Sequence, residues 1–235
     1  MCADSAHKTL PVLTGGAYLH VSKKHSEYAE KARSALSVFA STSPSYLILR
    51  SLDLCNKYLD ENIRTEISNC IELTESAKTT LQKKNVFIEK SEPLKIVINA
   101  SKIGYSGIEL SDTLRNSKIE PEFSDNDYVV LMVSPKNTER DFERLIAAFE
   151  SIIPNKPKKN ENIYISKAKR AISIREAVFS PYERISVDKA LGRICASPTV
   201  SCPPAIPISV SGELISEYEI KVFRYYGIDS IEVVK

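Results

Sequence analysis

The chain has 235 residues, of which 43% are hydrophobic and 26% are charged, a composition typical of a globular protein with one large domain or two to three small ones. Lys and Arg number 32 against 30 Asp and Glu, so the net charge of +2 is too balanced for the basic surface that binding to nucleic acid or an anionic membrane usually requires. We therefore expect a small-molecule substrate or protein partners, and neither nucleic acid nor membrane.

The cysteine spacing and the lack of long apolar segments indicate which metal sites and which cellular compartment to expect. The five cysteines are scattered, without a CxxC pair or metal-ligand spacing, which predicts a reducing compartment and no metal site. The first twenty residues lack a basic segment followed by an apolar run, and no stretch reaches ~18 consecutive apolar residues. We therefore expect a cytoplasmic protein.

A His-Lys pair precedes the first predicted strand. Residues 16–21, GAYLHV, form a short run rich in apolar and aromatic residues, which predicts a buried strand just after His7 and Lys8. Apolar residues at helical spacing then predict a helix from Lys24 to Phe39. The pair is expected to lie in a loop at one end of the strand.

A serine- and proline-containing stretch, STSPSY at residues 41–46, is expected to break the helical pattern. The position before Pro44 is biased away from helical geometry, and Ser43 is a candidate cap for the next helix. That helical region is predicted from about Ser45 to Lys84, with a bend near Asn62.

Short strands alternate with helices after this region, in the order β-β-α-β-β-α, which predicts a small α+β domain with a mainly antiparallel sheet. The expected elements are strands at 86–90, 94–100, 119–124 and 128–134 and helices at 107–115 and from about Thr138. Residues 154–162, PNKPKKNEN, predict a solvated linker rather than a basic binding patch.

The last seventy or so residues predict a further compact unit. Residues 180–196 indicate a turn, a strand and a short helix, and residues 200–213 an extended proline-rich loop with a strand. A closing helix is expected within 214–227, ended by Gly227.

The surroundings of Lys8 allow two interpretations. Ser5, His7 and Thr9 place three hydrogen-bonding side chains around it, a combination that suits a phosphate as well as an amine. A lysine that forms a Schiff base needs a desolvated site or neighbouring positive charge to release its proton. The alternative is an exposed cation beside an imidazole with a purely structural role.

Three segments, in the same order along the chain as in the family, resemble a known family. DSAHKTLPVLTGGAYLH, residues 4–20, closely resembles the cofactor-lysine segment of the Orn/Lys/Arg decarboxylases, which are pyridoxal-phosphate enzymes of aspartate-aminotransferase fold. Residues 41–53, STSPSYLILRSLD, resemble the family's TSP-containing segment, and residues 181–213 are similar to its C-terminal domain. One departure is Ala205, where the family commonly has glycine after two prolines.

The resemblance implies an α/β and α+β fold with pyridoxal 5'-phosphate as cofactor. The expected parts are a remnant of the cofactor-binding large domain of fold type I with long connecting helices (1–90), a small α+β domain (91–157) and a C-terminal decarboxylase-type domain (158–235). Lys8 would form the Schiff base with the cofactor, and Ser5 and His7 would contact its phosphate. The bound ring would act as an electron sink when a basic amino acid loses carbon dioxide.

Three further residues are weaker candidates. Ser41 and Thr42 match a segment that lies near the cofactor across a dimer interface in the family, but they could merely end one helix and start another. Glu213 is a candidate substrate-pocket residue, or a charge that begins the final helix.

The family also places a long stretch before the cofactor lysine, which carries a glycine-rich phosphate turn and the aspartate that pairs with the pyridine nitrogen. Only Met1–Asp4 precede Ser5 here. The resemblance therefore implies the C-terminal half of a decarboxylase, inactive alone and completed by a separate N-terminal half or a full-length paralogue, in an assembly of at least two chains.

Two alternatives stay open at this point. One is a non-catalytic oligomerisation or regulatory subunit that binds a full-length decarboxylase. The other is a different lysine-dependent cofactor enzyme, such as an aminotransferase or desulfurase, which the segment CPPAIPISVSGE at 202–213 disfavours. The sequence does not choose among lysine, arginine and ornithine as the substrate.

Overall fold

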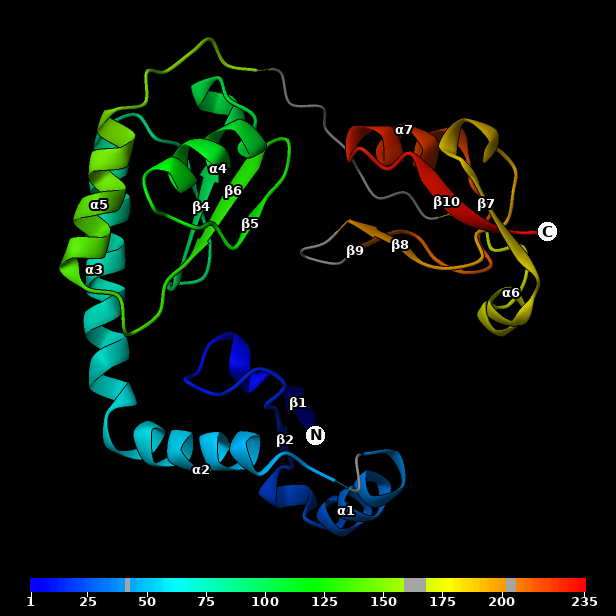
Figure 1. Cartoon of the computed structure of the whole chain (residues 1–235), viewed down its shortest axis with the longest axis horizontal. Coiled ribbons are helices and arrows are strands. Elements are labelled where there is room, and N and C mark those ends of the chain that lie inside the picture. Colours follow the sequence, from blue (N-terminus) through cyan, green and yellow to red (C-terminus); the bar gives the residue numbers. More distant parts are fainter. Residues whose placement is uncertain (41–42, 159–167, 202–205) are drawn as a thin grey trace. The chain divides into compact units, whose positions relative to one another are not determined.

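The computed structural model describes residues 1–40, 43–158, 168–201 and 206–235 (Figure 1). The chain forms two compact units. The first unit comprises Met1–Ser76 with Val133–Phe142, and the second comprises Ala77–Met132 with Glu143–Lys235. Strands and helices occur in both, which agrees with the mixed α/β class expected from the sequence.

The first unit begins with a pair of short strands. Strand β1 (Cys2–Asp4) pairs antiparallel with β2 (Tyr18–His20), so the strand predicted at 16–21 is present in shortened form and β1 is an unpredicted partner. The expected burial is wrong, because Leu19 and His20 are exposed in this two-stranded pair. A short 3₁₀ helix, η1 (Ala6–Lys8), follows β1. The predicted helix from Lys24 is divided into a 3₁₀ turn, η2 (Lys23–His25), and helix α1 (Glu27–Phe39).

The long helical region divides where the sequence predicted a bend. Helix α2 (Tyr46–Glu61) ends at Asn62, and α3 (Ile63–Lys83) begins directly after it. The cap of α2 is Ser45, not Ser43: Ser45 has an extended backbone, and its hydroxyl accepts a hydrogen bond from the Ile48 amide.

A polar cluster braces the junction of these helices in the first unit. The hydroxyl of Tyr58 on α2 donates to Glu66 on α3 at 2.5 Å, and the Lys136 ammonium lies 2.7 Å from the same carboxylate and 4.7 Å from the Tyr58 ring centroid. Lys136 and Tyr58 hold the pKa of Glu66 below its ordinary value. The carboxylate therefore stays ionised and joins three segments of the unit.

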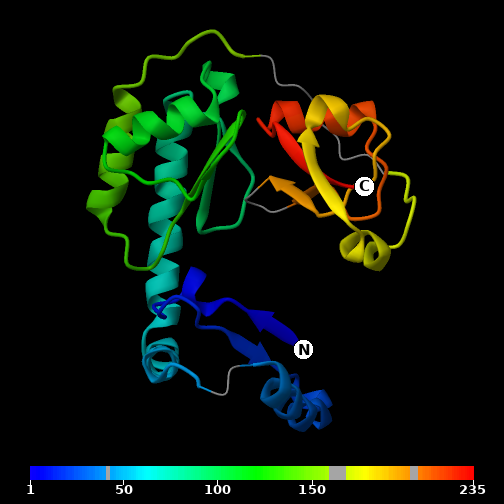
Figure 2. The same cartoon turned by 45° about the vertical axis from the view of Figure 1, so that its right-hand side comes forward.

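The second unit contains the predicted four-stranded antiparallel sheet, in the order β3-β4-β6-β5. Its elements are β3 (Ile88–Glu89), β4 (Lys95–Asn99), η3 (Ser101–Ile103), α4 (Gly107–Asn116), β5 (Phe123–Ser124), β6 (Tyr128–Met132) and most of α5 (Glu139–Glu150), whose residues up to Phe142 belong to the first unit. The expected β-β-α-β-β-α order is confirmed, although β5 is much shorter than the strand expected at 119–124. Figures 1 and 2 both show α5 alongside the end of α3, where Lys84 and Glu150 form a 2.8 Å ion pair.

Alternating side chains of the central strands fill the core of this sheet domain. Ile96 and Ile98 of β4 and Val129 of β6 are fully buried, as are Leu110 and Leu114 of α4. The period of two on the strands and the spacing of four on the helix bring these side chains to one interface. Strand β3 pairs with β4 although it lies before the domain boundary expected at residue 90, and the domain boundaries themselves stay predictions.

The described part of the expected linker is attached to the sheet domain. The amide of Asn155 donates to the Ile103 carbonyl at 3.0 Å, and the amide of Lys158 donates to the Ser101 carbonyl at 2.9 Å. The Lys158 ammonium also pairs with Glu109 at 2.6 Å. Residues 154–158 therefore form a strap on the domain rather than a free connector, whereas residues 159–162 lie outside the described part.

The C-terminal module, residues 168–235, combines short strands with two helices. Its elements are α6 (Ile174–Phe179), β7 (Tyr182–Ser186), η4 (Val187–Lys189), β8 (Thr199–Ser201), β9 (Ile206–Ser209), α7 (Glu217–Tyr225) and β10 (Ser230–Val234). Strand β7 pairs antiparallel with β10, and β8 pairs with β9. Phe223, Val233 and Cys195 are fully buried at the centre of this module.

Predicted elements of the module are confirmed at β7, η4 and α7, and the chain turns after α7 at Gly227, with φ of 68°. Helix α6 and strand β10 were not predicted.

Two hydrogen bonds join the C-terminal module to the four-stranded sheet within the second unit. The Tyr225 hydroxyl donates to the Asp127 carboxylate, and the Asn126 side chain donates to the Tyr225 carbonyl at 2.5 Å.

Candidate functional site

The segment that carries Lys8 is a tight turn that leaves strand β1. The backbone amide of Lys8 donates to the Ser5 carbonyl at 3.1 Å, and the Leu10 amide donates to the Ala6 carbonyl at 2.9 Å. The methyl group of Ala6 is buried beneath the turn. This arrangement points the buried residue inward and leaves Ser5 and Lys8 exposed on either side of it.

The His7 ring is fixed by one carbonyl. Its Nδ1 lies 3.0 Å from the Gly16 carbonyl, and the His7 backbone amide donates to the same oxygen at 3.2 Å. A carbonyl oxygen can only accept, so Nδ1 carries the hydrogen and Nε2 is left for a ligand. Among the residues that the structure describes, nothing hydrogen-bonds to Nε2.

Two glycines close the loop that supplies this carbonyl. Gly15 has φ of 95°, a left-handed conformation that favours glycine, and Gly16 is buried. A Cβ on Gly16 would lie 2.3 Å from Cγ1 of Val12 and 3.2 Å from the Leu13 carbonyl oxygen. Glycine is therefore required at residue 16 for the loop to pack closely enough to reach His7.

Helix α2 supports the same loop. The Leu13 amide donates to the Ser51 hydroxyl at 3.2 Å, and the Tyr18 hydroxyl donates to the Leu52 carbonyl at 2.9 Å. Burial, with a smaller effect of nearby Cys55, raises the pKa of Tyr18, so the phenol stays protonated and able to donate. Sequence reasoning missed Tyr18 and Ser51 as supports, since only a contact between α2 and the loop distinguishes them from ordinary strand and helix residues.

The charged groups near Lys8 are paired with one another rather than with Lys8. Asp4 lies 3.1 Å from Nε2 of His20 across the β1–β2 pair and accepts a hydrogen bond from the exposed Cys2 thiol at 3.2 Å. The Asp4 carboxylate raises the pKa of Cys2. No described residue forms an ion pair or hydrogen bond with the Lys8 ammonium.

The three expected cofactor contacts of this turn therefore carry unused polar groups. The structure brings Ser5, His7 and Lys8 together on one turn, with the Ser5 hydroxyl, His7 Nε2 and the Lys8 ammonium without partners in the described part of the chain. A hydroxyl and an ammonium donate to a phosphate, as does Nε2 of an imidazole whose ring carries both hydrogens, and an amine can also bond covalently to an aldehyde. This donor set fits pyridoxal phosphate.

The other candidates are not brought to this turn. Ser41 and Thr42 lie outside the described residues, as does Ala205. Glu213 does not begin the final helix, which was an incorrect expectation: Glu213 and Leu214 form antiparallel bridges with Arg170 and Ile194, and α7 begins only at Glu217, after its cap Ser216.

The carboxylate of Glu213 instead accepts a hydrogen bond from the Val210 amide at 2.8 Å. This contact closes the turn between β9 and the residues before α7. Glu213 belongs to the second unit and Lys8 to the first. A role for Glu213 in substrate binding stays a prediction.

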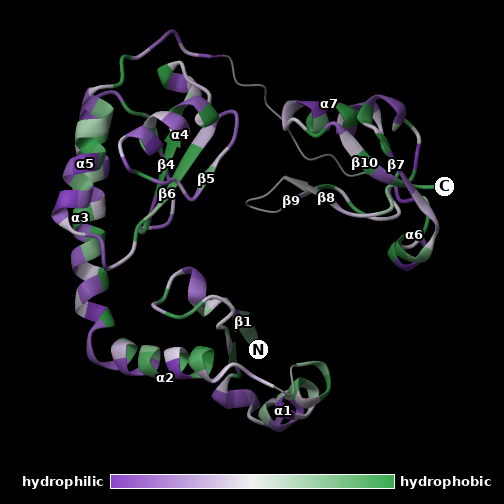
Figure 3. Cartoon of the chain, viewed as in Figure 1, coloured by the Kyte–Doolittle hydropathy of each residue, from purple (hydrophilic) through white to green (hydrophobic). Residues whose placement is uncertain are grey.

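Hydrophobic residues recur along α1 and α2 (Figure 3), and several of them are exposed. None of the thirteen residues of α1, all of which the structure describes, is buried, and Phe39 at its end is 88% exposed. On α2 only Cys55 is buried, whereas Tyr46 is 83% and Leu47 71% exposed. An apolar surface of this kind is typical of a face that packs against further protein.

Three observations concern metal sites, membrane spans and cysteines. Within the described ranges, no group of three or more His, Cys, Asp or Glu side chains is placed to hold a metal ion. None of the described helices is both long enough and apolar enough to cross a membrane. The four described cysteines, Cys2, Cys55, Cys70 and Cys195, are free thiols.

Two family models match the chain. Residues 1–99 match the model described as Orn/Lys/Arg decarboxylase, major domain, and residues 158–230 match the model described as Orn/Lys/Arg decarboxylase, C-terminal domain. Both matches belong to one family and occur in the order of its domains.

Curated relatives and solved structures agree with these matches. Arginine decarboxylase of Bacillus anthracis is 30% identical over 95% of this chain and 49% of the relative, and that of Bacillus subtilis is 28% identical over 94% and 49%. The chain thus spans about half the length of the curated relatives it matches. The constitutive lysine decarboxylase of E. coli (TM-score 0.77, 13% identity) and lysine decarboxylase LdcF of Francisella novicida (TM-score 0.77, 15% identity) share the fold over 99% of this chain and 49% and 48% of theirs.

Proposed function

Because the chain belongs to the Orn/Lys/Arg decarboxylase family, we propose that it provides the lysine-bearing half of a pyridoxal-phosphate-dependent site that decarboxylates a basic amino acid. The observation that carries this proposal is the turn at residues 5–8. Three polar side chains on it have unused hydrogen-bonding groups, and one of them, His7, is held in a single orientation by Gly16.

Each residue of the turn has a distinct proposed role. Lys8 supplies the amine that bonds covalently to the cofactor aldehyde, and the Ser5 hydroxyl and His7 Nε2 donate to its phosphate. Since Gly16 fixes the hydrogen on Nδ1, Nε2 donates to a phosphate oxygen only when the ring is protonated; in the neutral ring it accepts. When bound, the cofactor supplies an electron sink for the negative charge left by loss of carbon dioxide.

The names of the relatives support a basic amino acid as the substrate. The curated relatives cited above are named arginine decarboxylases, and the similar structures are titled lysine decarboxylases. We favour arginine, because the relatives with higher sequence identity carry that name, with lysine and ornithine as alternatives.

The remainder of the site would come from major-domain sequence that this chain does not contain. The chain corresponds to about half of its relatives, and α1 and α2 expose apolar faces that nothing in the described chain covers. We propose that the missing half of a major domain covers these faces, in an assembly of at least two chains. The chain alone would then lack decarboxylase activity.

The same apolar faces also favour a second candidate function. A non-catalytic subunit could use α1 and α2 to bind a full-length decarboxylase and regulate or assemble it. Lys8 distinguishes the two functions, because association through apolar helices does not require its ammonium. The cytoplasmic location expected from the sequence stays a prediction.

The test combines cofactor binding with complementation. The chain would be co-expressed with the N-terminal half of the Bacillus subtilis arginine decarboxylase, purified as a complex, and examined by visible absorbance with pyridoxal phosphate before and after borohydride reduction. We expect an absorbing adduct that reduction fixes on Lys8, and carbon dioxide release from one of the three basic amino acids.

The matched control is Lys23→Ala, which removes another exposed lysine from a 3₁₀ turn of the first unit. Lys8→Ala should abolish both signals, and Lys23→Ala should leave them intact. A stable complex whose adduct and activity do not depend on Lys8 would contradict the catalytic role and favour the non-catalytic subunit.

A further inference from the structure

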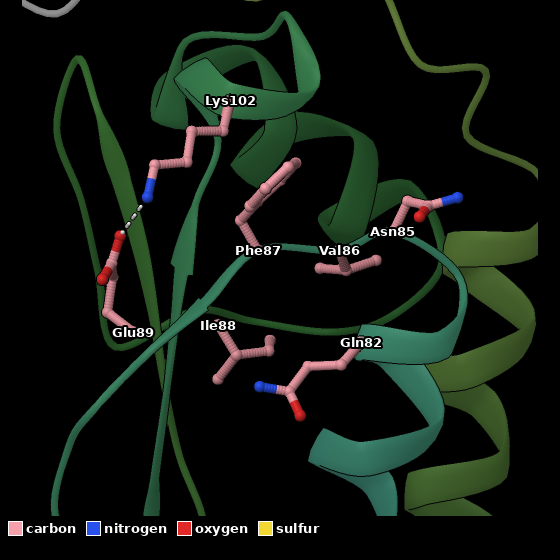
Figure 4. A pocket seen from close by; sticks show the side chains of 7 residues that line it. All are labelled: Gln82, Asn85, Val86, Phe87, Ile88, Glu89 and Lys102. Atoms are coloured by element: carbon pink, nitrogen blue, oxygen red, sulfur yellow. Dashed lines mark hydrogen bonds and ion pairs between the residues drawn. The ribbon is translucent and has the colours of Figure 1, made fainter.

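A small cavity lies in the second unit, between the end of α3 and η3 (Figure 4). Its volume is about 270 Å³, and it is lined by Gln82, Asn85, Val86, Phe87, Ile88, Glu89 and Lys102. Since a water occupies about 30 Å³ in the liquid, the space equals about nine waters and suits a molecule of amino-acid size. None of the proposed cofactor-binding residues belongs to this unit, and the candidate substrate residue Glu213, which does, is not in the cavity lining.

One end of the cavity carries a pair of opposite charges. The Lys102 ammonium lies 3.1 Å from Oε1 of Glu89, and the side-chain amide of Asn99 donates to the same oxygen at 2.9 Å. These two donors hold the pKa of Glu89 below its ordinary value, so the carboxylate is ionised at neutral pH.

The pair has hydrogen-bonding capacity left over. Oε2 of Glu89 has no partner among the described residues, and the Lys102 ammonium uses only one of its three N–H groups on a side-chain oxygen there. An incoming ammonium can therefore bind to Glu89 while an incoming carboxylate binds to Lys102. Both contacts would be charge-assisted.

The middle of the cavity is apolar. The Phe87 side chain is 45% exposed, with its ring 5.5 Å from the Lys102 ammonium, and Val86 is buried beside it. The Phe87 carbonyl accepts a hydrogen bond from the backbone amide of Asn99 at 2.8 Å, so the backbone that carries the ring is fixed to β4. An exposed ring on a fixed backbone offers a surface for methylene groups.

Two side-chain amides lie at the other end. Figure 4 shows Gln82 and Asn85 away from the Glu89–Lys102 pair, with Val86 and Phe87 between Asn85 and the pair and Ile88 between Gln82 and Glu89. Both amide side chains are exposed and can donate as well as accept. Asn85 has φ of 62°, a left-handed conformation that asparagine tolerates better than most residues and that ends α3 here.

We propose that this cavity binds a free α-amino acid with a polar side-chain end. The zwitterionic head binds to Glu89 and Lys102, the methylene groups lie on Phe87 and Val86, and the polar end binds to Gln82 and Asn85. A nucleotide fits poorly, because its phosphates would meet one cation already paired with a carboxylate. The inference goes beyond the proposed function, because it needs neither Lys8 nor the cofactor.

The test uses amide chemical shifts of the isotope-labelled chain carrying Lys8→Ala, without pyridoxal phosphate, so that the candidate cofactor site makes no contribution. L-Arginine and L-glutamine are titrated as probes. Agmatine is arginine without its carboxylate and tests the head group, and L-norleucine tests the polar end. We expect saturable shifts at Asn85, Glu89 and Lys102 with both probes, and at least tenfold weaker binding of agmatine and norleucine.

Two variants and a matched control locate the site. Lys102→Met should weaken L-arginine binding at least tenfold, and Phe87→Ala provides an independent test should the first variant fold poorly. The control Lys95→Met breaks the exposed 3.1 Å ion pair of Lys95 with Glu92 in the same domain and should leave binding unchanged.

Three results would overturn the proposal. The first is the absence of saturable shifts with either probe. The second is L-arginine binding that neither Lys102→Met nor Phe87→Ala weakens, which would place the ligand elsewhere. The third is agmatine binding as tight as that of L-arginine, which would contradict the assigned contacts of the head group.

Discussion

Replacing Gly16 by alanine should loosen the turn that carries Lys8. The new Cβ would lie 2.3 Å from Cγ1 of Val12, whose branched side chain has few alternative rotamers, and 3.2 Å from the Leu13 carbonyl oxygen. Overpacking of this kind costs about 1–3 kcal/mol, either as lost stability or as displacement of the loop. Because the Gly16 carbonyl holds both His7 Nδ1 and the His7 amide, the displacement should release the His7 ring.

Two measurements test this prediction: one follows the hydrogen bond of the His7 ring, and the other follows the stability of the chain. The Nδ1–H proton of His7 should be visible by NMR in the parent chain and lost by exchange with water in Gly16→Ala. Urea unfolding of the same samples should show a loss of stability within the range given above. In the co-expressed complex, the Lys8-dependent adduct should form more weakly.

The matched control is Gly227→Ala. Gly227 has φ of 68° but open space around its Cβ position, so alanine there meets backbone strain of about 1–2 kcal/mol without overpacking. It should lower stability and leave the His7 proton and the adduct unchanged. If Gly16→Ala keeps the Nδ1–H signal and full stability, the proposed packing of the loop against His7 is wrong.

Three further substitutions test other parts of the structure. Hydrogen bonds from Lys158 and from Ser106, the N-terminal cap of α4, lower the pKa of Glu109 to about 2. The stabilising effect of the ionised Glu109 carboxylate is therefore complete above the unfolded-state pKa of about 4.3 and is lost as the pH falls through about 2. Because the pair is more than half exposed at Glu109, Glu109→Gln should reduce the unfolding free energy at pH 7 by no more than about 1 kcal/mol, with no difference near pH 2. Tyr225→Phe removes a hydrogen bond to the Asp127 carboxylate and should lower stability by about 1.5 kcal/mol; an unchanged urea midpoint would argue against this contact. Leu110→Ala empties a fully buried position and should lower stability by about 2–5 kcal/mol, whereas a loss below 1 kcal/mol would contradict the packing described.

Sequence periodicity predicted the long elements well. The sequence predicted one helical region from about Ser45 to Lys84 with a bend near Asn62, and the structure has the break between α2 and α3 at that residue. The alternation of β4 and β6 predicted the antiparallel sheet, because each strand buries alternate residues on one face.

Short elements were missed because their stability comes from distant partners. Strand β1 has three residues and exists only because β2 pairs with it, and β10 is defined by its register with β7. Glu213 was placed at the start of a helix because the backbone pairing of Leu214 and Ile215 with other segments leaves no trace in local composition.

The candidate site was predicted as a set of residues but not as a geometry. The resemblance indicated Ser5, His7 and Lys8, and the structure shows why His7 has one free nitrogen. The support from Gly16 and Ser51 depends on a loop folding back on itself and on α2. Contacts of that kind cannot be inferred from the spacing of a motif alone.

The pairing of β7 with β10 has a consequence for the kinetics of folding. Arg184 on β7 and Glu232 on β10 form a 2.9 Å ion pair although 48 positions separate them in the chain. The loop between the strands must close before any of their hydrogen bonds can form, which makes pairing slow compared with the growth of a helix. We expect α2 and α3 to form early in refolding and the C-terminal module to reach its native state in a later, slower phase.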